Sequence, residues 1–300
     1  MDRTLVTDQT GKQRISRTNA LGQLINVWEV TASDSATGTV SFPNQTLSAG
    51  YQTSYSYDTL NNLTTVNQGG QTRSFTYSSL SRLLSAQNPE SGTIGYQYDN
   101  NGNLTSKTDA RPITTTYTYD ALNRVMQRSY SDGTTPTVTY TYDNLTNAKG
   151  KLIKVSSSVS QTEYTSFDIL GRVLAHKQTT DGNAYTTAYS YNLAGALVEE
   201  TYPSTRVVKN VLDTDGDLSI VQSKKNANQG YFNYAKNFTY TSAGAVSSMQ
   251  LGNGKWESTQ FNSRLQPTQI ALGTVQNGFD KLKLNFDYGA TTNNGNVQSQ

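Results

Sequence analysis

Tyr98-Asp99-Asn100-Asn101-Gly102-Asn103-Leu104 contains, in seven residues, the pattern that decides the fold. An aromatic residue is followed by Asp, three residues later by Gly, and two residues after that by an aliphatic residue. The pattern returns about every 21 residues between Tyr57 and Val246. Because self-similarity at a fixed period is the signature of a repeat architecture, we interpret the chain as an array of short structural units.

Each unit is predicted to be a β-hairpin. Ahead of most copies, aromatic and polar residues alternate, as in Tyr117-Thr118-Tyr119, and a spacing of two places both rings on one face of a strand. The following Asp or Asn accepts hydrogen bonds from backbone N–H groups two residues on, which predicts a turn. The aliphatic residue then begins a second strand. The repeat aromatics are Tyr57, Tyr77, Tyr98, Tyr119, Phe167, Tyr191 and Tyr240.

The fourth position of each turn is Gly or Asn, with Ser81 as the departure. Gly and Asn adopt a positive φ at little cost, so this position is explained by turn geometry alone. A single hairpin is marginally stable in water, and stacked hairpins therefore supply each other's stability. The predicted structural turn positions are Gly22, Asn61, Gly102, Asn123, Gly171, Gly195, Gly216 and Gly244.

The composition limits the classes of function. Charged residues make up 15% and hydrophobic residues 34%, with 20 Tyr among many uncharged polar residues, which favours sheets with wet or half-wet faces. Disorder is the alternative, against which the regular aromatic positions argue. The net charge of +2 gives no electrostatic reason to expect nucleic acid. The absence of Cys excludes disulfides and thiolate chemistry, and no segment approaches the ~20 apolar residues of a membrane span.

The organisation predicted from these patterns is one continuous array over residues 1–300. Residues 25–50 are expected to hold a degenerate repeat, and residues 143–152 a turn insertion after Tyr142. Because neither end shows a terminating feature, we expect the chain to be a piece of a longer polypeptide.

Candidate sites of other kinds are weak. Asp213-Thr214-Asp215-Gly216-Asp217 resembles the start of a calcium loop, but its Gly is fourth and its twelfth position is Lys224, where an EF-hand requires Gly sixth and Glu twelfth. A catalytic triad would have to use His176, the only histidine. Glu199 and Glu200 point to opposite faces of a strand. We expect no catalytic residue, metal or cofactor. Ion pairs are predicted across two turns, Asp120 with Arg124 and Asp168 with Arg172.

The hairpins resemble YD repeats, the unit of bacterial Rhs proteins, of the C component of insecticidal toxin complexes and of the teneurin shell. Tyr119-Asp120-Ala121-Leu122-Asn123-Arg124-Val125 and Phe167-Asp168-Ile169-Leu170-Gly171-Arg172-Val173 fit the consensus closely. Segments nearer the two ends also resemble recurring Rhs segments: residues 7–12 with 19–24, residues 261–267, and residues 293–296. The resemblance therefore covers nearly the whole chain.

The resemblance implies a hollow β shell around a cargo, often a toxic C-terminal polypeptide. The Asp-Pro-rich motif at which many such shells cleave themselves is not present in this sequence. The resemblance therefore implies for this chain the role of a shell wall, but neither the self-cleavage nor the toxin. The expected fold class is thus all-β, an array of antiparallel hairpins forming a curved or spiral shell segment. The alternative fold is a β-propeller in which two repeats form one four-stranded blade.

The expected function is a non-enzymatic shell segment that encloses or sequesters a polypeptide such as a toxin. The alternative is a cell-surface glycan-binding or adhesion module that uses exposed Tyr rows. The expected partners are further repeats of the same polypeptide, an enclosed toxin and, under the alternative, a surface carbohydrate, with no nucleic acid and no membrane span. The resemblance places the parent protein outside the cell or at its surface.

Overall fold

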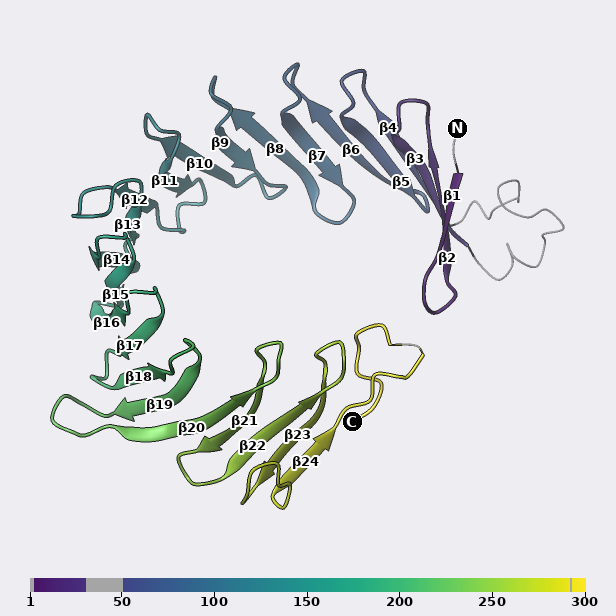
Figure 1. Ribbon diagram of the computed structural model, residues 1–300. Helices are drawn as coiled ribbons and strands as arrows, with labels where there is room; N and C mark the ends of the chain where they lie inside the picture. The colour runs from purple at the N-terminus through teal and green to yellow at the C-terminus, as the bar shows by residue number, and fades with distance from the viewer. Residues whose placement is uncertain (1–2, 31–50, 292) are drawn as a thin grey trace. The chain divides into compact units, whose positions relative to one another are not determined.

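The computed structural model describes residues 3–30, 51–291 and 293–300, and its named elements are all β-strands (Figure 1). None of the described residues forms a helix of the length and apolar character needed to cross a membrane. The strands are β1 Arg3–Thr7, β2 Gln13–Thr18, β3 Leu24–Val30, β4 Gln52–Tyr57, β5 Leu63–Gln68, β6 Gln71–Tyr77, β7 Leu83–Asn88, β8 Gly92–Tyr98, β9 Leu104–Thr108, β10 Thr114–Tyr119, β11 Val125–Tyr130, β12 Val138–Tyr142, β13 Leu152–Ser156, β14 Ser160–Phe167, β15 Val173–Thr180, β16 Asn183–Tyr191, β17 Leu197–Thr201, β18 Val207–Leu212, β19 Leu218–Lys224, β20 Phe232–Tyr240, β21 Val246–Leu251, β22 Trp256–Phe261, β23 Pro267–Gly273 and β24 Leu282–Asn285.

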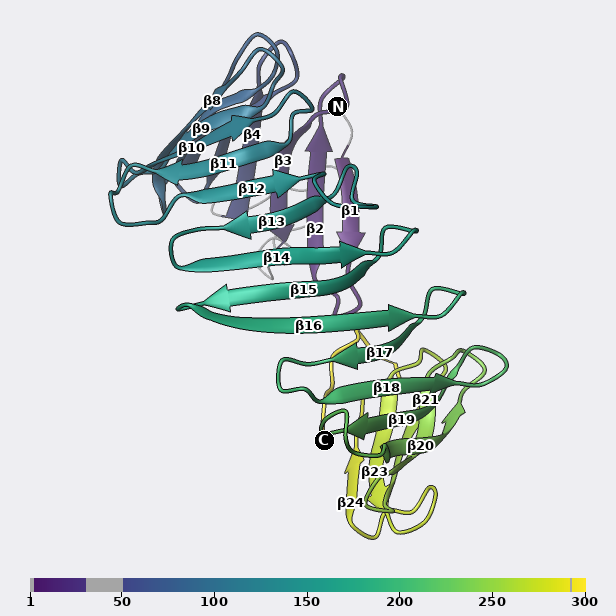
Figure 2. The ribbon, with the colours of Figure 1, turned by 90° about the vertical axis from the view of Figure 1, so that its left-hand side faces the viewer.

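The described strands belong to one 24-stranded sheet, in which strands consecutive in the sequence pair antiparallel from β1 to β12 and from β13 to β24. Figure 2 shows this plainly for β14 to β19, which lie side by side with alternating directions. The prediction of an all-β array of antiparallel hairpins is confirmed. The propeller alternative is wrong, because its strands would divide among separate four-stranded sheets.

The chain forms two compact units, Met1–Thr139 (unit 1) and Tyr140–Gln300 (unit 2), and the division falls inside β12. A single continuous array over the whole chain stays a prediction. Of the expected degenerate repeat, residues 25–30 belong to β3 and the rest lie outside the described residues. The expected insertion is a turn over residues 143–151, after which β13 begins at Leu152.

The turns that follow the repeat aromatics share one geometry, shown by Asp58 to Asn62. The N–H of Asn61 donates to the carbonyl of Asp58 over 3.1 Å, and the N–H of Asp58 donates to the carbonyl of Asn62 over 3.0 Å. This is a type I turn followed by a left-handed residue, a common hairpin connection. The φ angles of the left-handed residues are 76° at Gly22, 67° at Asn61, 59° at Ser81, 90° at Gly102, 60° at Asn123, 73° at Gly171, 94° at Gly195, 92° at Gly216 and 80° at Gly244.

A β-bulge beside each turn fixes where the repeat aromatic points. Tyr57 lies opposite Leu63, but the preceding Ser56 lies opposite Thr65, so Thr64 is the extra residue on the return strand. The same register shift precedes Tyr77, Tyr98 and Tyr119. A bulge increases twist and re-aims side chains locally, and here it keeps the aromatic and aliphatic residues of one repeat on the same face.

The sheet has very little core. Nine hydrophobic side chains of the described residues are buried, and Ile15 is the largest that is fully enclosed. The cluster in unit 2 consists of Ala148, Ile153 and Phe167. Ala148 comes from the turn at residues 143–151, so the insertion covers the end of β14.

We predict that Gly102→Val lowers the free energy of unfolding by about 1–3 kcal/mol, because it forces a β-branched residue to a positive φ. An added Cβ at Gly102 would meet only the Arg82 side chain, at ordinary contact distances from 3.7 Å, so the cost is in the backbone. Gly95→Val is the matched control, since Gly95 lies within β8 with open space around it. Urea unfolding of both variants tests this, and equal stability would contradict the assigned turn.

Candidate functional site

Four of the seven repeat aromatics connect their hairpin to the one before it. In each, the tyrosine hydroxyl donates to the backbone carbonyl of the aliphatic residue that begins the return strand of the preceding hairpin. The four bonds run from Tyr57 to Leu24 (2.9 Å), Tyr119 to Leu104 (2.7 Å), Tyr191 to Val173 (3.1 Å) and Tyr240 to Leu218 (2.6 Å). We call them the tyrosine bonds.

Burial supports the donor role of these hydroxyls. It raises the pKa of Tyr57, Tyr119 and Tyr240 above the ordinary value, so each hydroxyl keeps its proton through the neutral range. A half-buried hydroxyl without a partner would cost free energy, and the preceding strand's carbonyl supplies that partner. The repeat aromatic is therefore both a packing group and a connection between hairpins.

Arginine makes a second connection. The guanidinium of Arg172 lies 4.6 Å from the centre of the Tyr191 ring in the next hairpin, and its Nε is 2.5 Å from Asp168 Oδ2 in its own turn. Arg82 likewise lies 5.9 Å from the Tyr98 ring and donates to the carbonyl of Asp99 over 2.7 Å. Cation–π contacts of this kind contribute about 0.5–1 kcal/mol at exposed sites.

Both predicted ion pairs are present, since Asp120 and Arg124 approach to 2.7 Å in the same way as Asp168 and Arg172. Such pairs set side-chain geometry more than stability.

The turn carboxylates are held by donors from their own turn. Asp58 Oδ1 accepts from the N–H groups of Leu60 (2.9 Å) and Asn62 (2.8 Å), and Oδ2 accepts from the Asn62 side chain (2.9 Å). These bonds, the Asn62 side chain first, lower the pKa of Asp58 below 3.8. The corresponding bonds lower the pKa of Asp99. In the loop after β11, bonds from Thr135 lower the pKa of Asp132 to about 2.

The other candidates from the sequence have structural roles. Asp213 Oδ1 accepts from the N–H groups of Asp215 and Asp217, as in the other turns. His176 Nδ1 lies 3.1 Å from the Tyr189 hydroxyl, and the two rings stack. Glu199 accepts from the hydroxyl of Tyr231 and Glu200 from that of Tyr202. In the described ranges no three metal-binding side chains come together.

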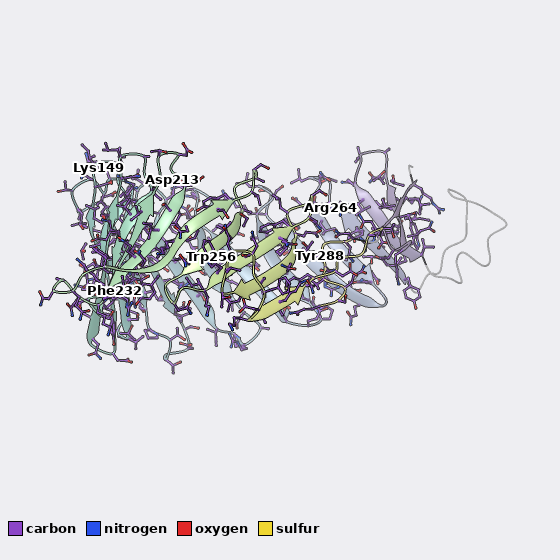
Figure 3. The ribbon with its side chains drawn as sticks, turned by 60° about the horizontal axis from the view of Figure 1, so that its bottom comes forward. Lys149, Asp213, Phe232, Trp256, Arg264 and Tyr288 are labelled. Atoms are coloured by element: carbon purple, nitrogen blue, oxygen red, sulfur yellow. The ribbon has the colours of Figure 1, made fainter. Side chains whose placement is uncertain are left out.

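A shallow cleft of about 410 Å³ lies on unit 2 at the rim opposite the repeat turns; Figure 3 shows Phe232 at this rim and Asp213 at the turn rim. It is lined by Phe232, Asn233, Tyr234, Leu251, Gly252 and Asn253. Phe232 and Tyr234 are exposed by 67% and 50%. Tyr234 is held in place, because its hydroxyl accepts from Arg206 (3.0 Å) and its carbonyl accepts from the Gly252 N–H (2.8 Å).

The sequence analysis did not predict two features of the site. The acceptor of each tyrosine bond is a backbone carbonyl on another hairpin, which no side-chain pattern reveals. The loop after β23 also packs on the sheet, where Gln276 donates to Ser248 (2.9 Å) and the N–H of Asn277 donates to Ser258 (3.1 Å). Gly273 was the available signal, because an added Cβ at this residue would come within 2.4 Å of the Gly278 backbone.

Comparison with known proteins agrees with this geometry. The family model of the RHS repeat matches residues 77–114 and 98–135, two matches that start one repeat apart at Tyr77 and Tyr98. A comparison with curated protein sequences finds no match.

Solved structures have the same fold. The crystal structure of TcdB2-TccC3 matches 96% of this chain with a TM-score of 0.77 at 16% identity. A Photorhabdus luminescens Tc holotoxin pore also matches 96%, with a TM-score of 0.77 at 15% identity, and a TcdB2-TccC3-Cdc42 structure matches 97%, with a TM-score of 0.69 at 14% identity. The chain spans 15% of the first two and 18% of the third.

We predict that Tyr119→Phe lowers the free energy of unfolding by about 0.5–1.5 kcal/mol, because it removes one tyrosine bond and leaves the ring in place. Tyr117→Phe is the control: Tyr117 lies two residues earlier on β10, and the described hydrogen bonds include none from its hydroxyl. Chemical denaturation compares the variants. A loss at Tyr117 as large as that at Tyr119 would show that the bond to Leu104 contributes nothing.

Acid is expected to destabilise the turns. Because folding lowers the pKa of Asp58, Asp99 and Asp132, their contribution is complete above the ordinary value of 3.8 and is lost as the pH falls through the folded values, to about 2 for Asp132. Asn can make the same turn without titrating, since Asn262 Oδ1 accepts from the N–H groups of Arg264 and Gln266.

The double variant Asp58→Asn/Asp99→Asn should therefore lose less thermal stability than the wild type between about pH 5 and about pH 2. Asp58→Ala/Asp99→Ala removes the acceptor altogether, and it should be less stable than the wild type at neutral pH. Thermal unfolding followed by circular dichroism gives the Tm values. Equal acid sensitivity of the wild type and the Asn variant would contradict the assigned role of these carboxylates.

Proposed function

We propose that this RHS-repeat chain is a segment of a β-sheet wall that encloses a polypeptide cargo, with no catalytic role of its own. The observation that carries the proposal is the fold match to TcdB2-TccC3, which covers nearly the whole chain and a small part of that much larger assembly. A repeat array that matches only 15% of such a structure is suited to be one portion of a larger enclosure.

The physical character of the sheet supports a wall. Its hairpins are joined through backbone pairs, turns and tyrosine bonds, and it extends by adding hairpins without enlarging a core. The sheet carries many uncharged polar residues, as in β10, where Thr on one face alternates with Tyr on the other. A surface of uncharged hydroxyl groups is hydrated by water and offers a polypeptide few charged partners to bind.

The absence of an assembled site supports a non-enzymatic role. Within the described residues, His176 is engaged with an aromatic neighbour, and the two adjacent carboxylates Glu199 and Glu200 accept from different tyrosines. The proposal has further repeats of the same polypeptide and an enclosed toxin as partners. It also places the parent protein in an exported assembly, as the resemblance to Tc toxin components suggests.

Glycan binding is the second candidate, and the cleft at Phe232 and Tyr234 favours it. Two rings on one face of β20 offer flat apolar surfaces to sugar rings, and Asn233 and Asn253 add amide groups that bond hydroxyls. The ring of Tyr234 is fixed by Arg206 before any ligand arrives, which reduces the ordering cost of binding.

The wall proposal predicts protection of an enclosed segment. The protein is expressed from its own gene with everything that precedes and follows this chain, imaged by cryo-electron microscopy and treated with protease. We expect polypeptide density enclosed by these hairpins and a segment that resists cleavage. Replacing Tyr57, Tyr119, Tyr191 and Tyr240 by Phe should speed that cleavage several-fold, whereas Tyr117→Phe should not. A particle without enclosed polypeptide would contradict the proposal.

The glycan candidate predicts binding to an immobilised carbohydrate array that is lost in Phe232→Ala/Tyr234→Ala. Tyr185→Ala is the control, because Tyr185 is similarly exposed on β16 and lies outside the cleft. If the wild type binds no sugar on the carbohydrate array, the glycan-binding function is excluded, whereas the wall proposal is unaffected.

A further inference from the structure

Four leucines stand out on the turn rim of unit 1. Leu21, Leu60, Leu80 and Leu122 each occupy the third position of a repeat turn, and their exposed fractions are 82%, 55%, 69% and 70%. We call this set the leucine rim. Single exposed leucines are ordinary on protein surfaces, but a row at one repeated position is not a random scatter.

Turn chemistry does not require these leucines. The turn is made by the acceptor at its first position and by the left-handed residue at its fourth, as with Asp58 and Asn61. The third position serves equally well as Asn101 or Asp215 in other copies of the same turn. The N–H of the third residue donates to the first side chain whatever residue stands there, whereas the leucine side chain makes no hydrogen bond and stays exposed, so the choice of leucine has its reason outside the turn.

Polar groups beside the leucines are already paired along the rim. Gln23 donates to Asn61 Oδ1 in the next turn over 2.6 Å, and Asn103 donates to Asn123 Oδ1 over 2.7 Å. These bonds run sideways from turn to turn and remain intact when the rim is covered. A partner that buries the leucines therefore has few unsatisfied polar groups to desolvate.

The spacing of the leucines specifies the partner. Successive repeat turns are two strands apart, so the row has a pitch of about 10 Å and spans about 40 Å from Leu21 to Leu122. A partner that contacts every leucine must carry apolar groups at the same pitch. A second array of the same repeats meets that condition by construction.

We infer that the leucine rim of one chain docks against the leucine rim of a second copy of this chain, in a two-fold arrangement. With the second row running in reverse, Leu21 faces Leu122 of the partner subunit, Leu80 faces its own equivalent, and Leu60 faces the partner subunit's Asn101. Asn101 is the one interruption in the row. The inference concerns the rim alone and does not depend on cargo enclosure.

The test is analytical ultracentrifugation of the full 300-residue chain over a concentration series. The wild type should show a reversible monomer–dimer equilibrium. Leu21→Ser/Leu60→Ser/Leu80→Ser/Leu122→Ser should be monomeric at the same concentrations. Asn101→Leu should lower the dimer dissociation constant by about tenfold or more, because two new leucines are buried per dimer.

Leu84→Ser/Met126→Ser is the matched control, since both side chains are exposed on strands of unit 1 and not in the third position of a repeat turn, and it should dimerise like the wild type. Circular dichroism establishes that each variant is folded. The Asn101→Leu variant decides the question if the fourfold variant does not fold. A wild type that stays monomeric, a folded fourfold variant that still dimerises, or no effect of Asn101→Leu would overturn the inference.

Discussion

The constraint on which the rest of the structure depends is that the described part of the chain fully buries few hydrophobic side chains. Only nine hydrophobic side chains of the described residues are buried, and most of them are small or stand alone on the sheet. A hairpin in such a chain has no core of its own and is marginal in isolation. Its stability must come from the neighbouring hairpins, through the backbone ladder and the contacts that cross from one repeat to the next.

The turn and the tyrosine bond act together to supply those contacts. A left-handed residue such as Gly102 closes the turn, and the adjacent bulge places Tyr98 opposite Leu104. The carbonyl of Leu104 is in turn the acceptor for Tyr119 of the next hairpin. Tyr57, Tyr119, Tyr191 and Tyr240 thus donate to the hairpin before them, and the backbone ladder joins the repeats that have no such bond, so the sheet can extend by adding hairpins. That property suits an enclosing wall better than a catalytic scaffold.

Much of the fold was predictable from the sequence, because each turn and the strands beside it are specified by residues close together in the chain. The spacing of Tyr119, Asn123 and Val125 specifies a strand, a left-handed residue and a return strand within seven residues. The positive φ of Thr205 and Leu265 was not predicted, since strand pairing imposes these conformations on residues that disfavour them. The tyrosine acceptors, the packing of the 274–281 loop and the cleft depend on residues far apart in sequence. Local patterns carry no signal for such contacts.

Native-state hydrogen exchange over a urea series tests most directly the claim that neighbouring hairpins stabilise one another. In unit 1, the amides of β6 to β9 are flanked on both sides by further hairpins, and they should open together with a common free energy and a common dependence on urea. Separate and much lower opening free energies for the β6–β7 and β8–β9 hairpins would show that each repeat stands alone, which would contradict mutual stabilisation of the hairpins.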